Sequence, residues 1–146
     1  MNIQHTEKLP PWFWAIAALA LLWNLAGVGA FIADAAMSEE TVSTLPQAQQ
    51  DMRGNTPAWL MIVYGIAVFT GLLGAIALLL RKQWAAPVFG VSLGAIIVQM
   101  GYVIFGLNAV RALGASAVMF PTFVVAIGVF LVWFALKSQR KGWLRA

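Results

Sequence analysis

The amino-acid sequence predicts an all-α fold, namely a four-transmembrane-helix bundle with a short interfacial helix on its outer side. Hydrophobic residues make up 62% of the chain and charged residues 10%, whereas soluble domains average about 45–50% and about 25%. The mean hydropathy is +0.84, and short clusters of charge separate long apolar stretches. These observations indicate a single-domain integral membrane protein, residues 1–146, whose first partner is the lipid bilayer.

Four stretches without any charged side chain set the positions of the helices. They cover residues 9–33, 54–80, 83–110 and 112–136. A helix needs about 20 mainly apolar residues to cross about 30 Å of hydrocarbon, so each stretch accommodates one span. A backbone in lipid must satisfy its own hydrogen bonds, and none of the stretches alternates in polarity as a barrel strand does. We therefore predict helical spans over residues 11–33, 57–80, 85–107 and 117–136.

Prolines and tryptophans support these boundaries. Pro10 and Pro11 stand at the start of the first span, where a missing N–H is harmless because first-turn donors have no partner within the helix. Trp12 and Trp14 follow, and an amphipathic ring prefers the headgroup region. Prolines stand near the starts of the later spans as well, at Pro57, Pro87 and Pro121.

The segment between the first two spans, residues 34–56, contains the pattern of a short outer helix. Thr44 followed three residues later by Gln47 is typical of a capping box. The apolar face of this helix comprises Leu45, Ala48 and Met52. The helix is either a lid over an outward-facing cavity or a compact connector, and the sequence favours the connector.

The distribution of cations predicts the orientation in the membrane. Seven of the nine Lys and Arg residues fall on the side of both termini: Lys8, Arg81, Lys82, Lys137, Arg140, Lys141 and Arg145. The positive-inside rule places that side in the cytoplasm, so both termini are expected there. Contact with anionic headgroups accounts for the pI of about 10.0, and no nucleic-acid partner is required.

Small residues predict where helices approach one another closely. One ridge lies on the second span and the other on the third; they comprise Ala67, Gly71 and Ala75, and Gly90, Gly94 and Gly101. Ridges of this kind favour tight packing within the molecule first and a homodimer or a membrane-protein partner second.

The polar residues inside the spans support two interpretations. Asn24 and Gln99 fall at similar depths in parallel spans, which predicts an interhelical hydrogen bond from Asn24 to Gln99 or to a tyrosine hydroxyl, worth roughly 0.6 kcal/mol. The alternative is a small outward-opening pocket for an uncharged polar solute, lined by Asn24, Tyr64, Gln99, Tyr102 and Trp23. The sequence favours the hydrogen bond.

At the outer rim, Asp34 ends the first span and Arg111 the third, which predicts a partly solvated ion pair worth at most about 1 kcal/mol.

Several chemistries lack candidate residues. The chain has no Cys, its one His is His5, and no Asp, Glu, Lys, Arg or His lies within a predicted span. Intramembrane ionisable groups are what proton-coupled transporters use, so proton coupling is disfavoured. We predict no catalytic residue, no metal site and no cofactor, and therefore no enzyme.

Three segments, residues 12–27, 56–82 and 84–99, point to a known family. Their most recognisable pieces are Trp23-Asn24 followed by Gly27, and Arg81-Lys82 followed by Trp84-Ala85. Over nearly its whole length the chain resembles small four-span bacterial inner-membrane proteins, mostly uncharacterised and often labelled "sugar transporter". The resemblance implies a bacterial inner-membrane location and carriage of a small neutral polar solute, and it assigns no residue a role.

Two functions therefore remain as expectations. The first is a non-enzymatic membrane bundle that binds a partner protein or a lipid through the glycine ridge and the basic tail. The second is a carrier or facilitator for a small neutral polar solute such as a sugar, built around the polar pocket.

Overall fold

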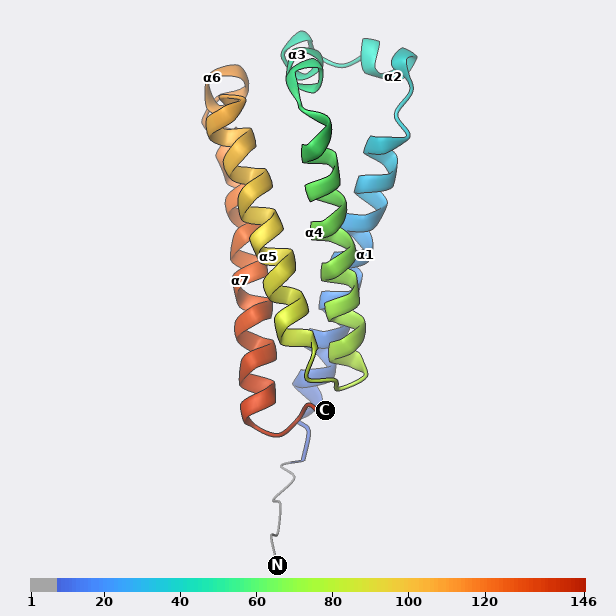
Figure 1. Ribbon diagram of the computed structural model, residues 1–146, viewed down its shortest axis with the longest axis vertical. Helices are drawn as coiled ribbons and strands as arrows, with labels where there is room; N and C mark the ends of the chain where they lie inside the picture. The colour runs from blue at the N-terminus through green and yellow to red at the C-terminus, as the bar shows by residue number, and fades with distance from the viewer. Residues whose placement is uncertain (1–7) are drawn as a thin grey trace, which may run out of the picture.

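Four long helices run side by side in the computed structural model, which describes residues 8–146 (Figure 1). They are α1 (Pro11–Ala35), α4 (Ala58–Leu79), α5 (Ala85–Gly101), which continues as the π-helical turn η1 (Tyr102–Gly106), and α7 (Met119–Arg140), which follows the 3-10 turn η2 (Ala115–Val118). Three short helices complete the fold: α2 (Glu39–Ser43), α3 (Gln47–Asn55) and α6 (Ala109–Leu113). Each long helix is long and apolar enough to cross a membrane, so the predicted four-helix bundle is confirmed.

Helix boundaries differ from the prediction mainly where charge was taken as the end of a span. α7 continues to Arg140, because Lys137 and Arg140 in its last turn interact favourably with the negative end of the helix dipole. α5 changes its hydrogen-bonding pattern at Tyr102, whose carbonyl accepts from Leu107 N–H at 2.9 Å. Such π-helical turns are frequent at functional sites.

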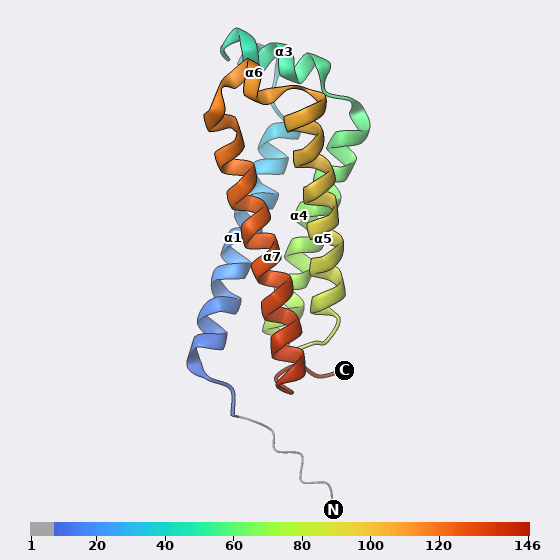
Figure 2. The same cartoon turned by 90° about the vertical axis from the view of Figure 1, so that its left-hand side faces the viewer.

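Neighbouring helices follow the order α1, α4, α5, α7, with α4 packed between α1 and α5 (Figures 1 and 2). α1 and α7 meet through aromatic side chains. The Trp23 and Phe123 rings lie edge to face with centroids 5.6 Å apart, and the Phe13 and Phe134 centroids are 5.7 Å apart. These contacts close the four helices into a bundle.

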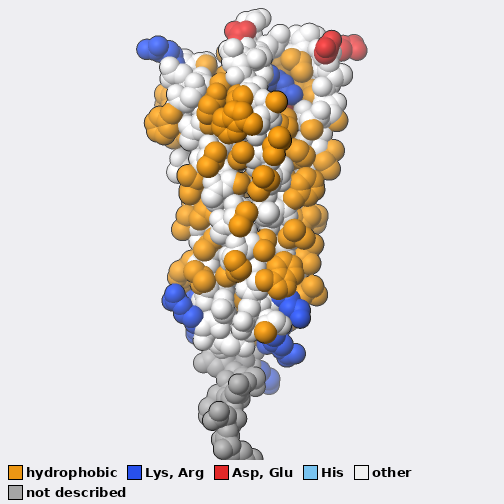
Figure 3. Space-filling model, in the orientation of Figure 1, with side chains coloured by type: hydrophobic (Ala, Val, Ile, Leu, Met, Phe, Trp, Pro, Cys, Tyr) orange, Lys and Arg blue, Asp and Glu red, His pale blue; other side chains and the backbone are white. Residues whose placement is uncertain are grey.

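The two ends of the bundle differ in charge. We call the end at which α1 begins and α7 ends the basic end, and the opposite end the α3 end. Figure 3 shows Lys and Arg at both ends, with the visible Asp and Glu confined to the α3 end and an apolar belt between them. The exposed rings of Trp12, Trp14, Trp84 and Trp133 border this belt near the basic end, as expected of residues at a headgroup boundary.

The hydrophobic core lies toward the basic end. Phe13, Leu78 and Phe134 are fully buried there. The buried residues of α1, namely Phe13, Ala17 and Ala20, all lie in its first half, and none of the described residues from Leu21 to Ala35 is buried. α1 therefore contributes buried side chains only in its half nearer the basic end.

The α4 ridge packs inside the molecule, as predicted. Ala67 and Ala75 are buried, and Gly71 lies directly beneath the Asn24 side chain of α1. On the α5 side, Ser92 Oγ donates to the Ala67 carbonyl at 2.7 Å. The small residues of α4 thus allow both neighbouring helices to approach closely.

The α5 ridge does not pack inside the molecule, so the expectation of tight internal packing is wrong for this helix. A side chain added at Gly90, Gly94 or Gly101 would meet nothing within 4 Å. α5 instead turns Phe89 and Ser92, on its opposite face, toward α4. The glycines are consequently left on the outside of the bundle.

The predicted outer helix is present as α3, but its predicted capping box is absent. Thr44 Oγ1 donates to the Thr41 carbonyl, and α3 begins only after Pro46. Gln47 Nε2 donates to Asp51 Oδ1 at 2.9 Å, one turn along α3. A proline fixes the backbone at this helix start in place of a side-chain cap.

Candidate interaction surfaces

Asn24 does not bond to Gln99, and that prediction is wrong. Its Nδ2 donates to the Ala20 carbonyl at 2.8 Å, four residues earlier in α1, and its Oδ1 lies against Gly71. An amide in an apolar environment must find partners, and the nearest carbonyl in its own helix supplies one. Gln99 is half-buried, and no side-chain hydrogen bond joins it to another described residue.

The remaining polar candidates take part in three separate aromatic contacts. Each is an edge-to-face pair, and the pairs are Trp23 with Phe123, Tyr64 with Phe31 at 5.1 Å, and Tyr102 with Trp59 at 5.0 Å. Such pairs stabilise helix packing beyond the area that they bury. Among the described residues, no hydrogen bond or ring contact links the five candidates, so their role as a solute pocket stays a prediction.

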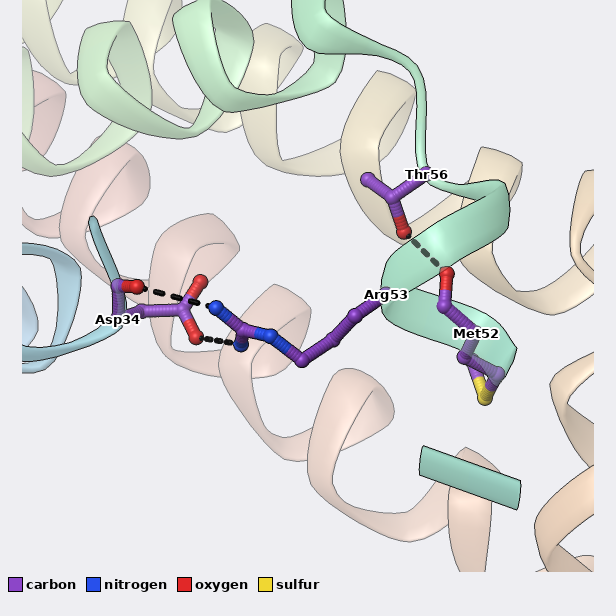
Figure 4. Close-up of polar contacts among 4 residues, drawn as sticks. All are labelled: Asp34, Met52, Arg53 and Thr56. Carbon is purple, nitrogen blue, oxygen red and sulfur yellow. Dashed lines mark hydrogen bonds and ion pairs between the residues drawn. The ribbon is translucent and has the colours of Figure 1, made fainter. Parts of the chain in front are cut away.

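At the α3 end, Asp34 pairs with Arg53 rather than with Arg111, which corrects the predicted ion pair (Figure 4). The Arg53 guanidinium donates to the Asp34 carboxylate, and its Nη2 donates to the Asp34 backbone carbonyl at 3.1 Å. α3 folds back toward the end of α1 and brings Arg53 with it. Arg111 belongs to α6, which lies over α5 and α7, and its side chain is exposed.

A surface hollow of about 410 Å³ lies at the α3 end, between α3 on one side and the end of η1 with α6 on the other. Its lining comprises Ala48, Asp51, Met52, Asn55, Gly106, Leu107 and Ala112. The lining combines apolar side chains with a carboxylate and an amide, which can orient a small polar molecule by hydrogen bonds. Sequence reasoning missed this hollow because its two walls are more than fifty residues apart in the chain.

A second hollow, of about 440 Å³, is shallow and entirely apolar in its exposed lining. Phe31, Gly65 and Phe69 are among the residues that form it, on the side of the bundle where α1 meets α4. A shallow apolar groove within the membrane belt is a surface that lipid chains fill. It offers no polar group to orient a solute.

At the basic end, the C-terminal residues fold back onto the turn between α4 and α5. Gly142 has a φ of 75°, which a glycine adopts without strain, and the chain reverses there. Gln83 N–H then donates to the Arg145 carbonyl at 2.7 Å, and Arg145 N–H donates to the Arg81 carbonyl. Residues 141–146, which we call the strap, thereby form a parallel bridge between Lys82 and Arg145.

Trp143 fixes the strap to the core. Its side chain is buried, and its ring lies edge to face with Trp12 at 5.3 Å and Phe13 at 5.8 Å. Trp143 Nε1 and Ser138 Oγ are buried and have no hydrogen-bond partner among the described protein atoms. The sequence suggested only a basic tail here, because the fold-back depends on contacts with residues more than sixty positions away.

No group of three or more His, Cys, Asp or Glu residues that could hold a metal ion occurs in residues 8–146. Comparisons with family models, curated proteins and solved structures found no match for this chain. Its class therefore follows from its own helices. Four apolar helices, each long enough to cross a bilayer, make it a multi-pass membrane protein.

Proposed function

We propose that this protein is a non-enzymatic bundle of the bacterial inner membrane that associates with a second copy of itself through α5. The basic end faces the cytoplasm in this proposal, in agreement with the positive-inside rule. The resemblance to small four-span inner-membrane proteins supports the same location. One observation carries the proposed association, namely the exposed glycine face of α5.

This face is open at its glycines. Gly90 and Gly94 are exposed, and Gly101, a further seven residues along, also has nothing within 4 Å of an added side chain. Val91, 55% exposed, stands beside the glycines, and Ile97, 53% exposed, follows them on the same face, between Gly94 and Gly101. Because Gly90 and Gly94 carry no side chain, they leave a shallow apolar groove next to Val91, where the backbone of a second helix can approach closely.

The glycines have no local function that explains them. Glycine in a helix interior is less favourable than alanine by about 0.8–1.0 kcal/mol, and a lipid-facing glycine forms few packing contacts in return. The matching ridge on α4 is used in full by α1 and α5. Small residues separated by three positions allow two membrane helices to approach closely, and this contact would offset the cost.

A second copy is the occupant that fits this groove best. Two chains with the same orientation in the membrane present identical α5 faces, and a twofold axis between them would bring each Gly90–Gly94 groove against the other. The exposed part of α5 carries no charged residue, so the pairing of like faces brings no charge repulsion.

Substitution of the groove tests the association. We expect Gly90→Leu with Gly94→Leu to weaken dimerisation in vesicles by about tenfold or more, since a loss of about 1.4 kcal/mol corresponds to tenfold. Gly29→Leu on α1 is the matched control, because Gly29 is also exposed with nothing within 4 Å. Energy transfer between labelled chains across a dilution series gives the dissociation constant.

The outcomes separate the alternatives. A wild-type chain that is monomeric at all dilutions, or a double variant that dimerises as well as Gly29→Leu, would refute the α5 contact. If crosslinking in native membranes joined this face to a different protein, that protein and not a second copy would be the partner of α5.

A carrier for a small neutral polar solute is the second candidate. The hollow lined by Asp51 and Asn55 favours it, because this hollow opens at the α3 end while the buried cluster lies toward the basic end. The vesicles prepared for the dimerisation experiment can also be used to test for transport. Solute flux above that of protein-free vesicles, across a panel of neutral sugars, would favour the carrier over a bundle that only associates.

A further inference from the structure

Charge at the basic end is uncompensated within the described residues. Its cations are Lys8, Arg81, Lys82, Lys137, Arg140, Lys141 and Arg145. The described carboxylate side chains, Asp34, Glu39, Glu40 and Asp51, all belong to the first loop or its borders at the opposite end (Figure 3). The ion pair found in residues 8–146 is also at that opposite end, between Asp34 and Arg53.

The strap places two of these cations side by side. Lys82 and Arg145 are the paired residues of an isolated parallel bridge, so their backbones are direct neighbours and their charges lie close together. Like charges in this arrangement repel, which destabilises the pairing. Two hydrogen bonds and the buried Trp143 nevertheless hold them together. A bound anion would convert this repulsion into attraction.

The turn that presents Lys82 has an unfavourable backbone conformation. Arg81 has a φ of 57°, in the left-handed region that a side chain disfavours. Its carbonyl accepts from Arg145 N–H, and its own Nε donates to the Trp143 carbonyl at 2.8 Å. Backbone strain of this kind persists where the surrounding contacts fix it, and it concentrates at sites that bind ligands.

The bridged cations lie at the depth of lipid headgroups. Trp84 follows the turn directly and is 43% exposed. Tryptophan rings collect at the membrane–water boundary, so this ring marks the boundary near Lys82. Lys137 lies over the Trp133 ring at 4.9 Å and Lys141 over the Trp143 ring at 5.3 Å, which holds further cations at the same end.

We propose that Lys82 and Arg145 together hold the phosphate of an anionic phospholipid against the turn and the strap. Arginine matches phosphate oxygens with two parallel N–H donors, and lysine adds a compact positive charge. A lipid rather than free phosphate is the occupant, because the site borders the apolar belt, where acyl chains can pack. This inference goes beyond the α5 contact and does not depend on it.

Retention of lipid by the purified full-length chain tests the proposal. The probe is phosphatidylglycerol, added to protein in a neutral detergent and measured by native mass spectrometry. A cation near an anionic surface contributes about fivefold in affinity, so we expect Lys82→Gln or Arg145→Gln to weaken binding about fivefold and the double variant about 30-fold. Phosphatidylcholine and inorganic phosphate form the comparison arms.

A charge-matched variant at the same end controls for diffuse attraction. Lys137→Gln with Arg140→Gln removes the same charge from the last turn of α7 without touching the bridge. Equal losses in the two double variants, equal retention of phosphatidylcholine, or competition by millimolar inorganic phosphate would overturn the proposal. Dimerisation of the same variants is measured separately. Loss of lipid with an intact dimer is the expected result, and lipid binding that survives the double variant would overturn the lipid site whether or not the chain dimerises.

Discussion

Gly74→Ala is expected to lower the free energy of unfolding by about 1–3 kcal/mol, the usual range for overpacking a well-packed core. The added methyl group would lie 2.7–3.0 Å from three atoms of the Phe89 ring. Phe89 is buried between α4 and α5, and a rigid ring cannot bend away as the end of a flexible side chain can. Either the ring leaves its rotamer or the two helices separate.

Gly29→Ala is the matched control for this loss. Gly29 is also a helical glycine, and an added methyl group there would meet nothing within 4 Å. Alanine is the better helix former by about 0.8–1.0 kcal/mol, so this variant should be neutral or more stable. Unfolding in mixed micelles, followed by far-ultraviolet circular dichroism, gives both values. Equal stability of Gly74→Ala and the wild-type chain would contradict the α4–α5 contact.

Trp143→Ala should lower the free energy of unfolding by about 3–5 kcal/mol, as expected when a buried aromatic ring is truncated. The variant removes the ring that contacts Trp12 and Phe13 and leaves a cavity under the strap. The strap then keeps its backbone bridge, the Arg81 and Gln83 side-chain hydrogen bonds and the buried Leu144, but loses its aromatic anchor. We expect amide protons near Arg145 to exchange much faster with solvent in this variant.

Trp84→Ala is the control for Trp143→Ala. The two positions carry the same side chain at the same end, but Trp84 is 43% exposed and Trp143 is 3% exposed. Truncation at Trp84 should therefore change the stability much less and leave hydrogen exchange in the strap unaltered. Equal losses at the two positions would show that the strap is not part of the core.

The sequence predicted the spans because their signal is local. Composition over some twenty residues decides whether a segment prefers lipid, and charge, proline and tryptophan mark its ends. The predictions were wrong where more than one hydrogen-bond or ion-pair partner was available to a side chain. Asn24 was assigned to Gln99 by depth alone, but the carbonyl of Ala20 in its own helix was closer.

The sequence also did not predict how each helix is rotated about its own axis, and therefore which of its faces is buried. The ridges of α4 and α5 have similar spacing, yet one is buried and the other exposed, because Phe89 and Ser92 direct the opposite face of α5 toward α4. The sequence did not predict the partner of Asp34, because that partner depends on where α3 places Arg53. It did not predict the strap either, because the strap is held by a contact between Trp143 and Trp12, which are far apart in the chain.

Cysteine accessibility in intact cells tests the expected topology, namely four crossings with the basic end in the cytoplasm. The chain has no native Cys, so single substitutions give a clean signal. Ser43→Cys in α2 should react with a membrane-impermeant maleimide from outside, and Gln139→Cys only after the membrane is permeabilised. Leu25→Cys, within α1, should stay unlabelled in both cases. Labelling of Gln139→Cys in intact cells, or of Ser43→Cys only after permeabilisation, would contradict this topology.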